Sequence, residues 1–186
     1  AQRYTGTGTR VGDTLNISGG YSPAAAMDTA GNLGVAWTTL NGQIYCRVVT
    51  PAGAYKVSEF RVDTGTVTKS NVSFGMNSKG AFIAAWRVLQ GGVPRVESRA
   101  FNADGTPQTN VRQHNDAALR HTYPLPSIAA GDTTALLVWV NSFCADTADR
   151  DVWGEFSSLV DRSTTAVGNP HTHVTSSLQS PHLPEI

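Results

Sequence analysis

The stretch Leu33-Gly34-Val35-Ala36-Trp37 is a short apolar run that ends in tryptophan, and the chain repeats this pattern twice. The later copies are Ala81-Phe82-Ile83-Ala84-Ala85-Trp86 and Ala135-Leu136-Leu137-Val138-Trp139, which places the three tryptophans 49 and 53 residues apart. Self-similarity at a period of about 20 to 50 residues is the signature of a repeat protein. We therefore interpret the chain as a series of repeats, each built around one of these tryptophans.

Residues on the N-terminal side of the tryptophans keep the same spacing. Met27 and Met76 precede their tryptophans by ten residues, and Gly31 and Gly80 precede them by six. A segment that runs from methionine to a glycine in this way is typical of a strand end followed by a tight turn. The third copy carries a shifted turn at Gly131. The pattern predicts two strands joined by a hairpin turn in each repeat.

A second block follows each tryptophan and predicts two further strands. It holds an apolar segment, a glycine four residues later, and an apolar pair seven and nine residues beyond that glycine. Alternation of this kind is the period-two pattern of a half-buried strand. The block occupies residues 44–62 and 96–114, residues 2–17 show it without a tryptophan, and residues 152–156 are its first strand in the third copy. In the second copy Arg112 and His114 replace the apolar pair.

Four short strands in a period of this length are typical of a β-propeller blade. We expect an all-β fold, either a β-propeller or part of one with about 3.5 four-stranded blades, and a β-sandwich is the alternative. The three tryptophans are expected to pack between blades as core. The whole of 1–186 is then a single β-repeat domain. Its parts are a partial blade at 1–20, repeats at 21–69, 70–122 and 123–179, and the start of a next repeat at 180–186.

An incomplete ring has consequences for partners. Propellers have at least about four blades, and the open sheet edges of a shorter array invite association. We therefore expect another polypeptide chain, or a second copy of this one, to complete the ring.

Composition limits the classes of function. The chain has 14 basic and 14 acidic residues and a formal net charge of zero, so nothing in its charge favours nucleic acid. No apolar run approaches the roughly 20 residues that span a bilayer, and membrane insertion is not expected. Cys46 and Cys144 are the only cysteines. They are either a disulfide formed in an oxidising compartment or two half-buried thiols, and both readings stay open.

The acidic loop between Trp139 and Trp153 is the one local cluster of carboxylates. Asp146, Asp149 and Asp151 could offer oxygen ligands to Ca²⁺, but the loop lacks the glycine and terminal glutamate of an EF-hand. A solvated hairpin loop is the other reading, and no other cofactor is expected. His171 and His173 alternate along a strand but have no nearby carboxylate or cysteine to complete a metal site.

Several short segments resemble a family of bacterial secreted and surface proteins that carry tandem copies of a propeller-like unit. The segments are Ala1-Gln2-Arg3-Tyr4, Glu59-Phe60-Arg61-Val62-Asp63-Thr64, Ala100-Phe101-Asn102-Ala103-Asp104-Gly105 and the three strands that end in tryptophan. The resemblance implies a secreted propeller, located outside the cell or on its surface (or in the periplasm), and it brings no catalytic motif.

These observations favour a non-catalytic binding or structural module of a secreted or surface protein. We expect it to contact a glycan or another protein through the loops between strands. The candidate contact residues are Asn41, Gln43, Gln90, Arg95 and Asp149. The alternative is a processed subunit of a secreted hydrolase, a glycosidase or peptidase, with its catalytic residues on another chain or segment. A spacer in a filament or adhesin stalk is a third possibility.

Overall fold

The computed structural model of the chain describes residues 1–17, 19–91, 93–114, 124–142 and 150–159. All regular secondary structure in these ranges is β-strand, which confirms the all-β prediction. The strands form separate antiparallel sheets of four, four, three and two strands, and none of these sheets closes on itself. The described ranges hold no helix that is long and apolar enough to cross a membrane.

The first sheet is an up-and-down sheet in which each strand pairs with the next along the chain. Its strands are β3 (Tyr21–Met27), β4 (Leu33–Thr38), β5 (Ile44–Val49) and β6 (Tyr55–Arg61). Because side chains alternate across a strand, β4 presents Val35 and Trp37 on one face and Ala36 on the other. The strand continues one residue beyond Trp37, to Thr38, and the Trp37 side chain is buried.

The second and third sheets repeat this topology. The second contains β7 (Lys69–Met76), β8 (Phe82–Gln90), β9 (Val93–Phe101) and β10 (Arg112–Gln113). The third contains β11 (Ser127–Ala130), β12 (Thr134–Ser142) and β13 (Arg150–Ser158). In the third sheet Trp139 pairs directly with Trp153 across β12 and β13. Each sheet therefore contains one of the three tryptophans, and Trp86 and Trp139 are both buried. The prediction that these strands end at tryptophan is wrong, because β8 continues to Gln90 and β12 to Ser142.

Six hairpin turns have the same hydrogen-bonding pattern. In the turn that starts at Thr50, the Gly53 amide donates to the Thr50 carbonyl and the Thr50 amide donates to the Ala54 carbonyl. The other five turns begin at Thr5, Asp28, Thr39, Asn77 and Asn102 and have glycine at the same fourth position. That glycine has a positive φ in every case, a conformation that side chains with a Cβ rarely adopt. The recurring glycines of the sequence are thus explained by turn geometry.

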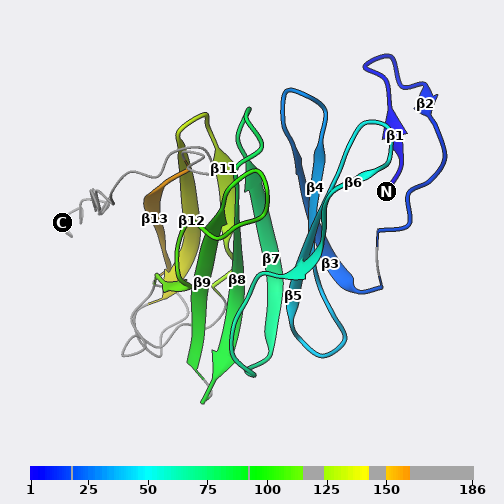
Figure 1. Cartoon of the computed structure of the whole chain (residues 1–186). Helices are drawn as coiled ribbons and strands as arrows, with labels where there is room; N and C mark the ends of the chain where they lie inside the picture. The colour runs from blue at the N-terminus through cyan, green and yellow to red at the C-terminus, as the bar shows by residue number, and fades with distance from the viewer. Residues whose placement is uncertain (18, 92, 115–123, 143–149, 160–186) are drawn as a thin grey trace.

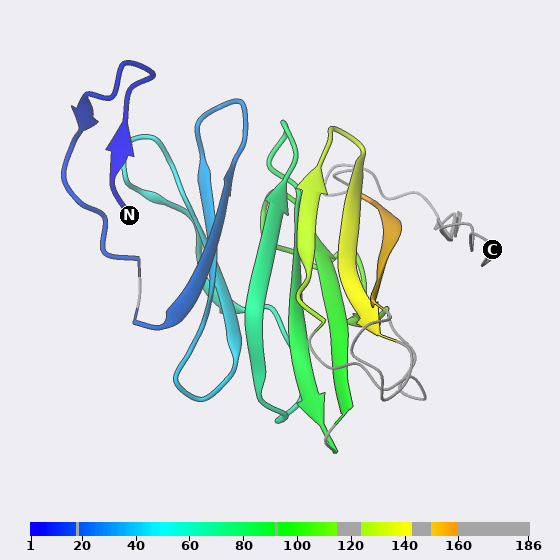
Figure 2. The same ribbon diagram turned by 180° about the vertical axis from the view of Figure 1, so that it is seen from behind.

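The three large sheets stack face to face, and their first strands lie side by side. β3 packs against β7, and β7 packs against β11, so the first strands line one edge of the stack (Figures 1 and 2). Glycines allow the close approach, because a methyl group added at Gly34 would lie 2.6 Å from Met76 and one at Gly75 would lie 2.5 Å from Ile128. The largest core cluster fills the space between the first and second sheets.

A short N-terminal hairpin lies at one end of the stack (Figure 2). It consists of β1 (Arg3–Tyr4) and β2 (Arg10–Val11), which pair with one another. At the opposite end, the outer face of the third sheet exposes apolar side chains: Val152 is 66% exposed and Phe156 is 51% exposed. We call this surface the open face.

Candidate functional site

The predicted contact residues of the first repeat lie in and beside the turn between β4 and β5. Asn41 is exposed in this turn, and Gln43 is half-buried at its end. The corresponding turn between β8 and β9 lies at the same end of the stack, the lower end in Figure 1. The structure therefore brings these two turns to one edge of the molecule.

The other predicted contact residues do not all lie in loops. Gln90 is the last residue of β8, and Arg95 lies within β9. The Arg95 guanidinium is 3.7 Å from the Glu97 carboxylate, and both side chains are mostly buried. Asp149 lies outside the described residues. Arg95 is thus placed on the face of a sheet, because β9 begins earlier than the sequence suggests.

The predicted calcium site falls largely outside the described part of the chain. Asp146 and Asp149 are not described, and for Asp151 the structure describes only the backbone, in β13. Within the described residues no group of three or more His, Cys, Asp or Glu side chains lies close enough to hold a metal ion. Calcium binding at this loop therefore stays a prediction, and His171 and His173 also lie outside the described ranges.

Cys46 is a free thiol buried between the first and second sheets. Burial raises its pKa far above the usual range, since a thiolate there would lose its hydration, so the group is unreactive in the folded chain. Cys144 lies outside the described residues.

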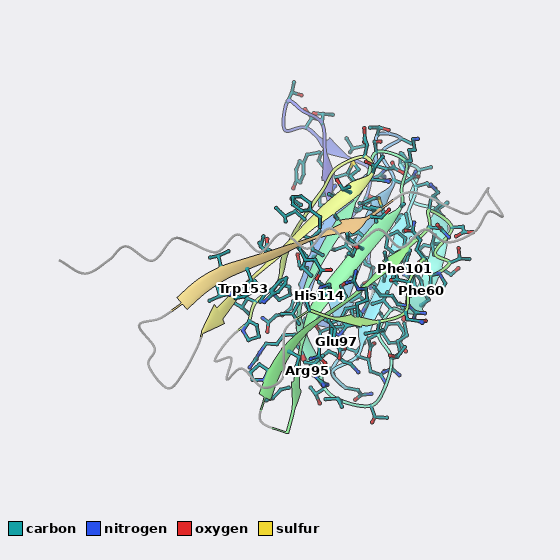
Figure 3. All side chains as sticks on the ribbon, turned by 90° about the vertical axis from the view of Figure 1, so that its left-hand side faces the viewer. Phe60, Arg95, Glu97, Phe101, His114 and Trp153 are labelled. Carbon is teal, nitrogen blue, oxygen red and sulfur yellow. The ribbon has the colours of Figure 1, made fainter. Side chains whose placement is uncertain are left out.

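A polar cluster occupies the space between the second and third sheets, and it is the feature of the described chain that departs most clearly from the repeat. It consists of Ser98 on β9, Arg112 on β10, His114 just after β10, and Glu155 on β13. Figure 3 views the stack from the side of the third sheet and labels His114 and Trp153. In the repeat pattern, Arg112 and His114 correspond to Phe60 and Val62, which are apolar.

A continuous series of hydrogen bonds connects the four side chains. The Ser98 Oγ lies 2.7 Å from His114 Nε2, and His114 Nδ1 lies 2.8 Å from Glu155 Oε2. Arg112 donates to the other carboxylate oxygen at 2.6 Å. An ionised carboxylate only accepts hydrogen bonds, so Nδ1 of His114 carries a proton. The ring of His114 also packs beside that of Trp139, with 5.7 Å between the ring centres.

This environment holds the pKa of Glu155 below its ordinary value. The hydrogen bond from His114 is the main cause, burial acts in the opposite direction, and the nearby charges of His114 and Arg112 add to the lowering. Glu155 is therefore ionised at neutral pH and provides the negative charge of the cluster.

The order serine, histidine, glutamate is that of an acyl-transfer triad, so accessibility decides what the cluster can do. Ser98 is 3% exposed and the His114 side chain is 1% exposed. A nucleophile must meet its substrate, and this hydroxyl lies inside a contact between two sheets. The cluster joins β9 and β10 of the second sheet to β13 of the third, and its evident effect is to fix these sheets to one another.

A second charged group connects the first and second sheets. Asp63, which follows β6, accepts hydrogen bonds from Arg61 and from the Ile44 amide, and Lys69 at the start of β7 lies 2.8 Å from its carboxylate. Burial alone would raise the pKa of Asp63. The hydrogen bonds from Arg61, Lys69 and Ile44 outweigh burial and lower it. The Asp63 within the segment 59–64, which carried the family resemblance, therefore has a structural role.

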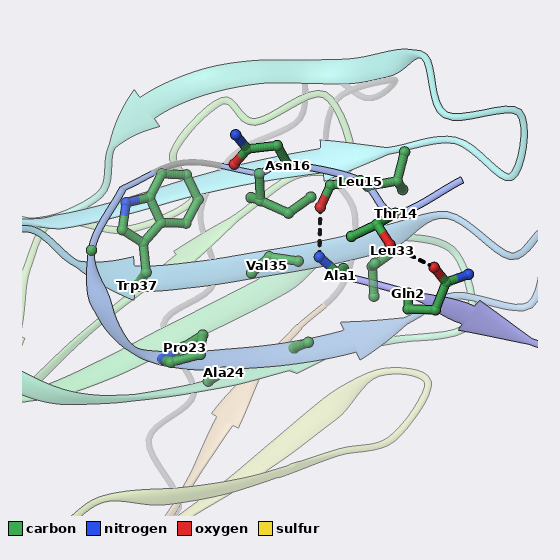
Figure 4. Close-up of a pocket in the computed structure, with 13 residues that line it drawn as sticks. Ala1, Gln2, Thr14, Leu15, Asn16, Pro23, Ala24, Leu33, Val35 and Trp37 are labelled. Atoms are coloured by element: carbon green, nitrogen blue, oxygen red, sulfur yellow. Dashed lines mark hydrogen bonds between the residues drawn. The ribbon is translucent and has the colours of Figure 1, made fainter. Parts of the chain in front are cut away.

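A cavity of about 690 Å³ that was not predicted from the sequence lies at the N-terminal end of the stack. One wall is the outer face of β3 and β4, with Leu33, Val35 and Trp37, and the other wall is the N-terminal segment, with Leu15 and Asn16 (Figure 4). The available signal was the repeat itself, since residues 2–17 match only the second half of a repeat.

A scan against profiles of protein families finds no family that matches the chain, and a search of curated proteins finds no relative.

Proposed function

We propose that the chain is a non-catalytic binding or structural module of β-propeller type, belonging to a secreted or surface protein. The observation that carries this proposal is the stack of similar up-and-down sheets whose first strands lie side by side. Radial stacking of such sheets is how propellers bury both faces of every blade. The resemblance to bacterial secreted and surface proteins with tandem propeller-like units supports the same proposal.

A rigid stack of this kind presents its turns as fixed contact points. The turns at one edge, with Asn41 and Gln43 in the first sheet, would meet a glycan or another protein. Amide side chains suit glycan hydroxyls because each offers both a donor and an acceptor. Further sheets, from another polypeptide or a second copy, would complete the ring.

Binding is tested with an immobilised glycan array and the double variant Asn41→Ala/Gln43→Ala. A matched control is Thr7→Ala/Ala52→Ser. Thr7 is exposed in the turn between β1 and β2, and Ala52 is exposed in the turn between β5 and β6. The proposal predicts binding that the first variant loses at least about tenfold, roughly the loss of one or two charge-free hydrogen bonds, while the control keeps it. Binding that both variants retain equally, or turnover of any arrayed glycan, would contradict the proposal.

One observation favours a different hydrolase hypothesis, in which the catalytic residues belong to this chain: the hydrogen-bonded order of Ser98, His114 and Glu155. If Ser98 were an activated nucleophile, a fluorophosphonate probe would label it and Ser98→Ala would abolish the label. Because both Ser98 and His114 are buried, we expect no labelling of the folded chain. Labelling at Ser98 would establish the hydrolase reading and overturn the non-catalytic one.

A further inference from the structure

The N-terminal segment reproduces the outer half of a four-stranded sheet. Tyr4 pairs with Arg10 as Val49 pairs with Tyr55, at the same distance from the turn glycine. Ala1 and Leu15 exchange hydrogen bonds at 2.6 and 2.7 Å, and this pair corresponds to the third- and fourth-strand pair at Cys46 and Phe60 in the first sheet. Residues 1–15 therefore match β5 and β6 at both ends of the pairing, although Arg3 pairs with Val11 where the bulged β5–β6 ladder pairs Val48 with Val57.

This segment also packs on the first sheet as β6 packs on the second. A methyl group added at Gly53 would lie 3.4 Å from Leu15, and one added at the corresponding Gly105 would lie 3.5 Å from Phe60. Arg47 of the first sheet donates to the carbonyl of Ile17. The N-terminal hairpin therefore occupies the place of the two outer strands of a preceding sheet.

The place of the two inner strands of that preceding sheet is the cavity. On the second sheet, the surface around Phe82, Ala84 and Trp86 is covered by the first sheet. The corresponding surface of the first sheet is formed by Leu33, Val35 and Trp37, and these three residues line the cavity. Among the described strands, β1 pairs only with β2, so the edge of β1 that would meet an inner strand has no strand beside it.

We propose that this cavity receives a β-hairpin of the same repeat type, with small apolar side chains on the face toward the cavity. Its second strand would pair with the free edge of β1, and its first strand would lie beside β3, as β3 lies beside β7. The proposal rests on the stacked-sheet part of the proposed function and is independent of glycan or protein binding at the turns. Addition of strands to an open sheet edge is an established mode of peptide recognition.

In the described part of the chain, no inner hairpin is available to fill the cavity. The hairpins β3–β4, β7–β8 and β11–β12 each already belong to a sheet of their own. An inner hairpin such as Tyr21–Thr38 takes 18 residues, which sets the length of the hairpin that the cavity would receive.

The chain itself shows what the donor must look like. Where the first sheet covers the second, its inner strands contribute the small side chains Ala24, Ala26 and Ala36, and Ala36 is completely buried. The residues that alternate with these point to the opposite face. A donor hairpin therefore needs small apolar residues on the face toward the cavity and tolerates change on the other.

The test titrates a synthetic peptide with the sequence of residues 21–38 into the ¹⁵N-labelled 186-residue chain, with calorimetry for affinity and amide shifts for location. We expect saturable binding of one peptide per chain, with shifts in residues 1–17 and in β3 and β4. In the peptide, Ala36→Arg places a charge against the cavity wall and should weaken binding at least about tenfold, which is about 1.4 kcal/mol. The matched peptide Val35→Thr, changed on the opposite face, should bind within about threefold of the parent.

Three results would overturn the inference: no binding, equal affinity of the Ala36→Arg and Val35→Thr peptides, or shifts confined to the open face. A chain that already forms a dimer and excludes the peptide would show that a second copy fills the cavity, and would overturn it as well. None of these outcomes alters binding at the turns, so the proposed function is judged separately by the array experiment.

Discussion

At the scale of single residues, the polar cluster shows how one repeat can change the chemistry of its packing while keeping its geometry. Between the first and second sheets, the equivalent positions hold Cys46, Phe60 and Val62, and Phe60 packs at 5.3 Å against the ring of Phe101. Between the second and third sheets, the cluster places hydrogen-bonded and charged groups in the same space. Buried polar groups are stable only when each has its partner, so the cluster is sensitive to the loss of one member.

Replacing His114 by alanine tests that sensitivity. The change removes the hydrogen bonds to Ser98 and Glu155 and leaves a mostly buried carboxylate with one partner fewer. We expect the free energy of unfolding in urea to fall by about 2 to 4 kcal/mol. The control is Asp13→Ala, which removes an exposed pair at 4.0 Å and should cost less than about 0.5 kcal/mol. Equal effects of the two variants would contradict the structural role of the cluster.

The lowered pKa values of Asp63 and Glu155 predict the acid side of the stability profile. A carboxylate with a depressed folded pKa stabilises the fold fully above its unfolded pKa, near 4, and this contribution is lost as the pH falls through the folded pKa. We expect the free energy of unfolding to decrease from about pH 5 downward. Asp63→Asn should be less stable than the parent at pH 7, and the gap should narrow toward pH 3. A gap that is constant across this range would show that Asp63 makes no such contribution.

At the scale of elements, the turns are the part of the fold that the sequence predicts best. Glycine at a fixed spacing indicated hairpin turns, and the structure confirms positive φ at Gly31, Gly53, Gly80 and Gly105. The side chain that opens the turn adds support, as when Asn77 accepts hydrogen bonds from the amides of Lys79 and Ala81. These are local interactions, and local interactions can be inferred from short stretches of sequence.

Gly53 and Gly105 occupy equivalent turns and form a matched pair of variants. Their φ values are +88° and +85°, so alanine at either position carries the same conformational cost of about 1 to 2 kcal/mol. A methyl group at Gly105 would also lie 2.7 Å from Val57, whereas at Gly53 the nearest contact is an ordinary 3.4 Å. We expect Gly105→Ala to lower the free energy of unfolding by about 1 kcal/mol more than Gly53→Ala. An equal loss of the free energy of unfolding, measured by urea denaturation, would mean that Val57 moves aside at no cost in free energy.

The candidate sites were harder to predict than the turns because they depend on contacts between repeats. The sequence showed that Arg112 and His114 break the apolar pattern, but not that Ser98 and Glu155 would meet them, since Glu155 lies 41 residues beyond His114. Arg95 was expected in a loop but lies within β9. Where a strand begins depends on its pairing with the neighbouring strand, which a local stretch of sequence does not show. The cavity depends on the packing of an incomplete repeat, which no local pattern encodes.

At the scale of the whole molecule, the two ends of the stack differ from its middle. Ile44 of the first sheet is completely buried by the second sheet, whereas Val152, at the equivalent position of the third sheet, is 66% exposed. Large exposed apolar surfaces are sites of association. At the other end, the N-terminal hairpin covers only part of the first sheet and leaves the cavity. Within the described residues, the stack is thus closed in its interior and open at both ends.

The sheets stack in chain order, with the first sheet on the second and the second on the third. The most direct test is a nuclear Overhauser experiment on methyl-labelled chain, because two glycines lie directly against side chains of the next sheet. We expect cross-peaks from the Gly34 α-protons to the Met76 methyl group and from the Gly75 α-protons to the Ile128 methyl group. Assigned resonances without these cross-peaks, or with Gly34 contacting the third sheet instead, would contradict the stack.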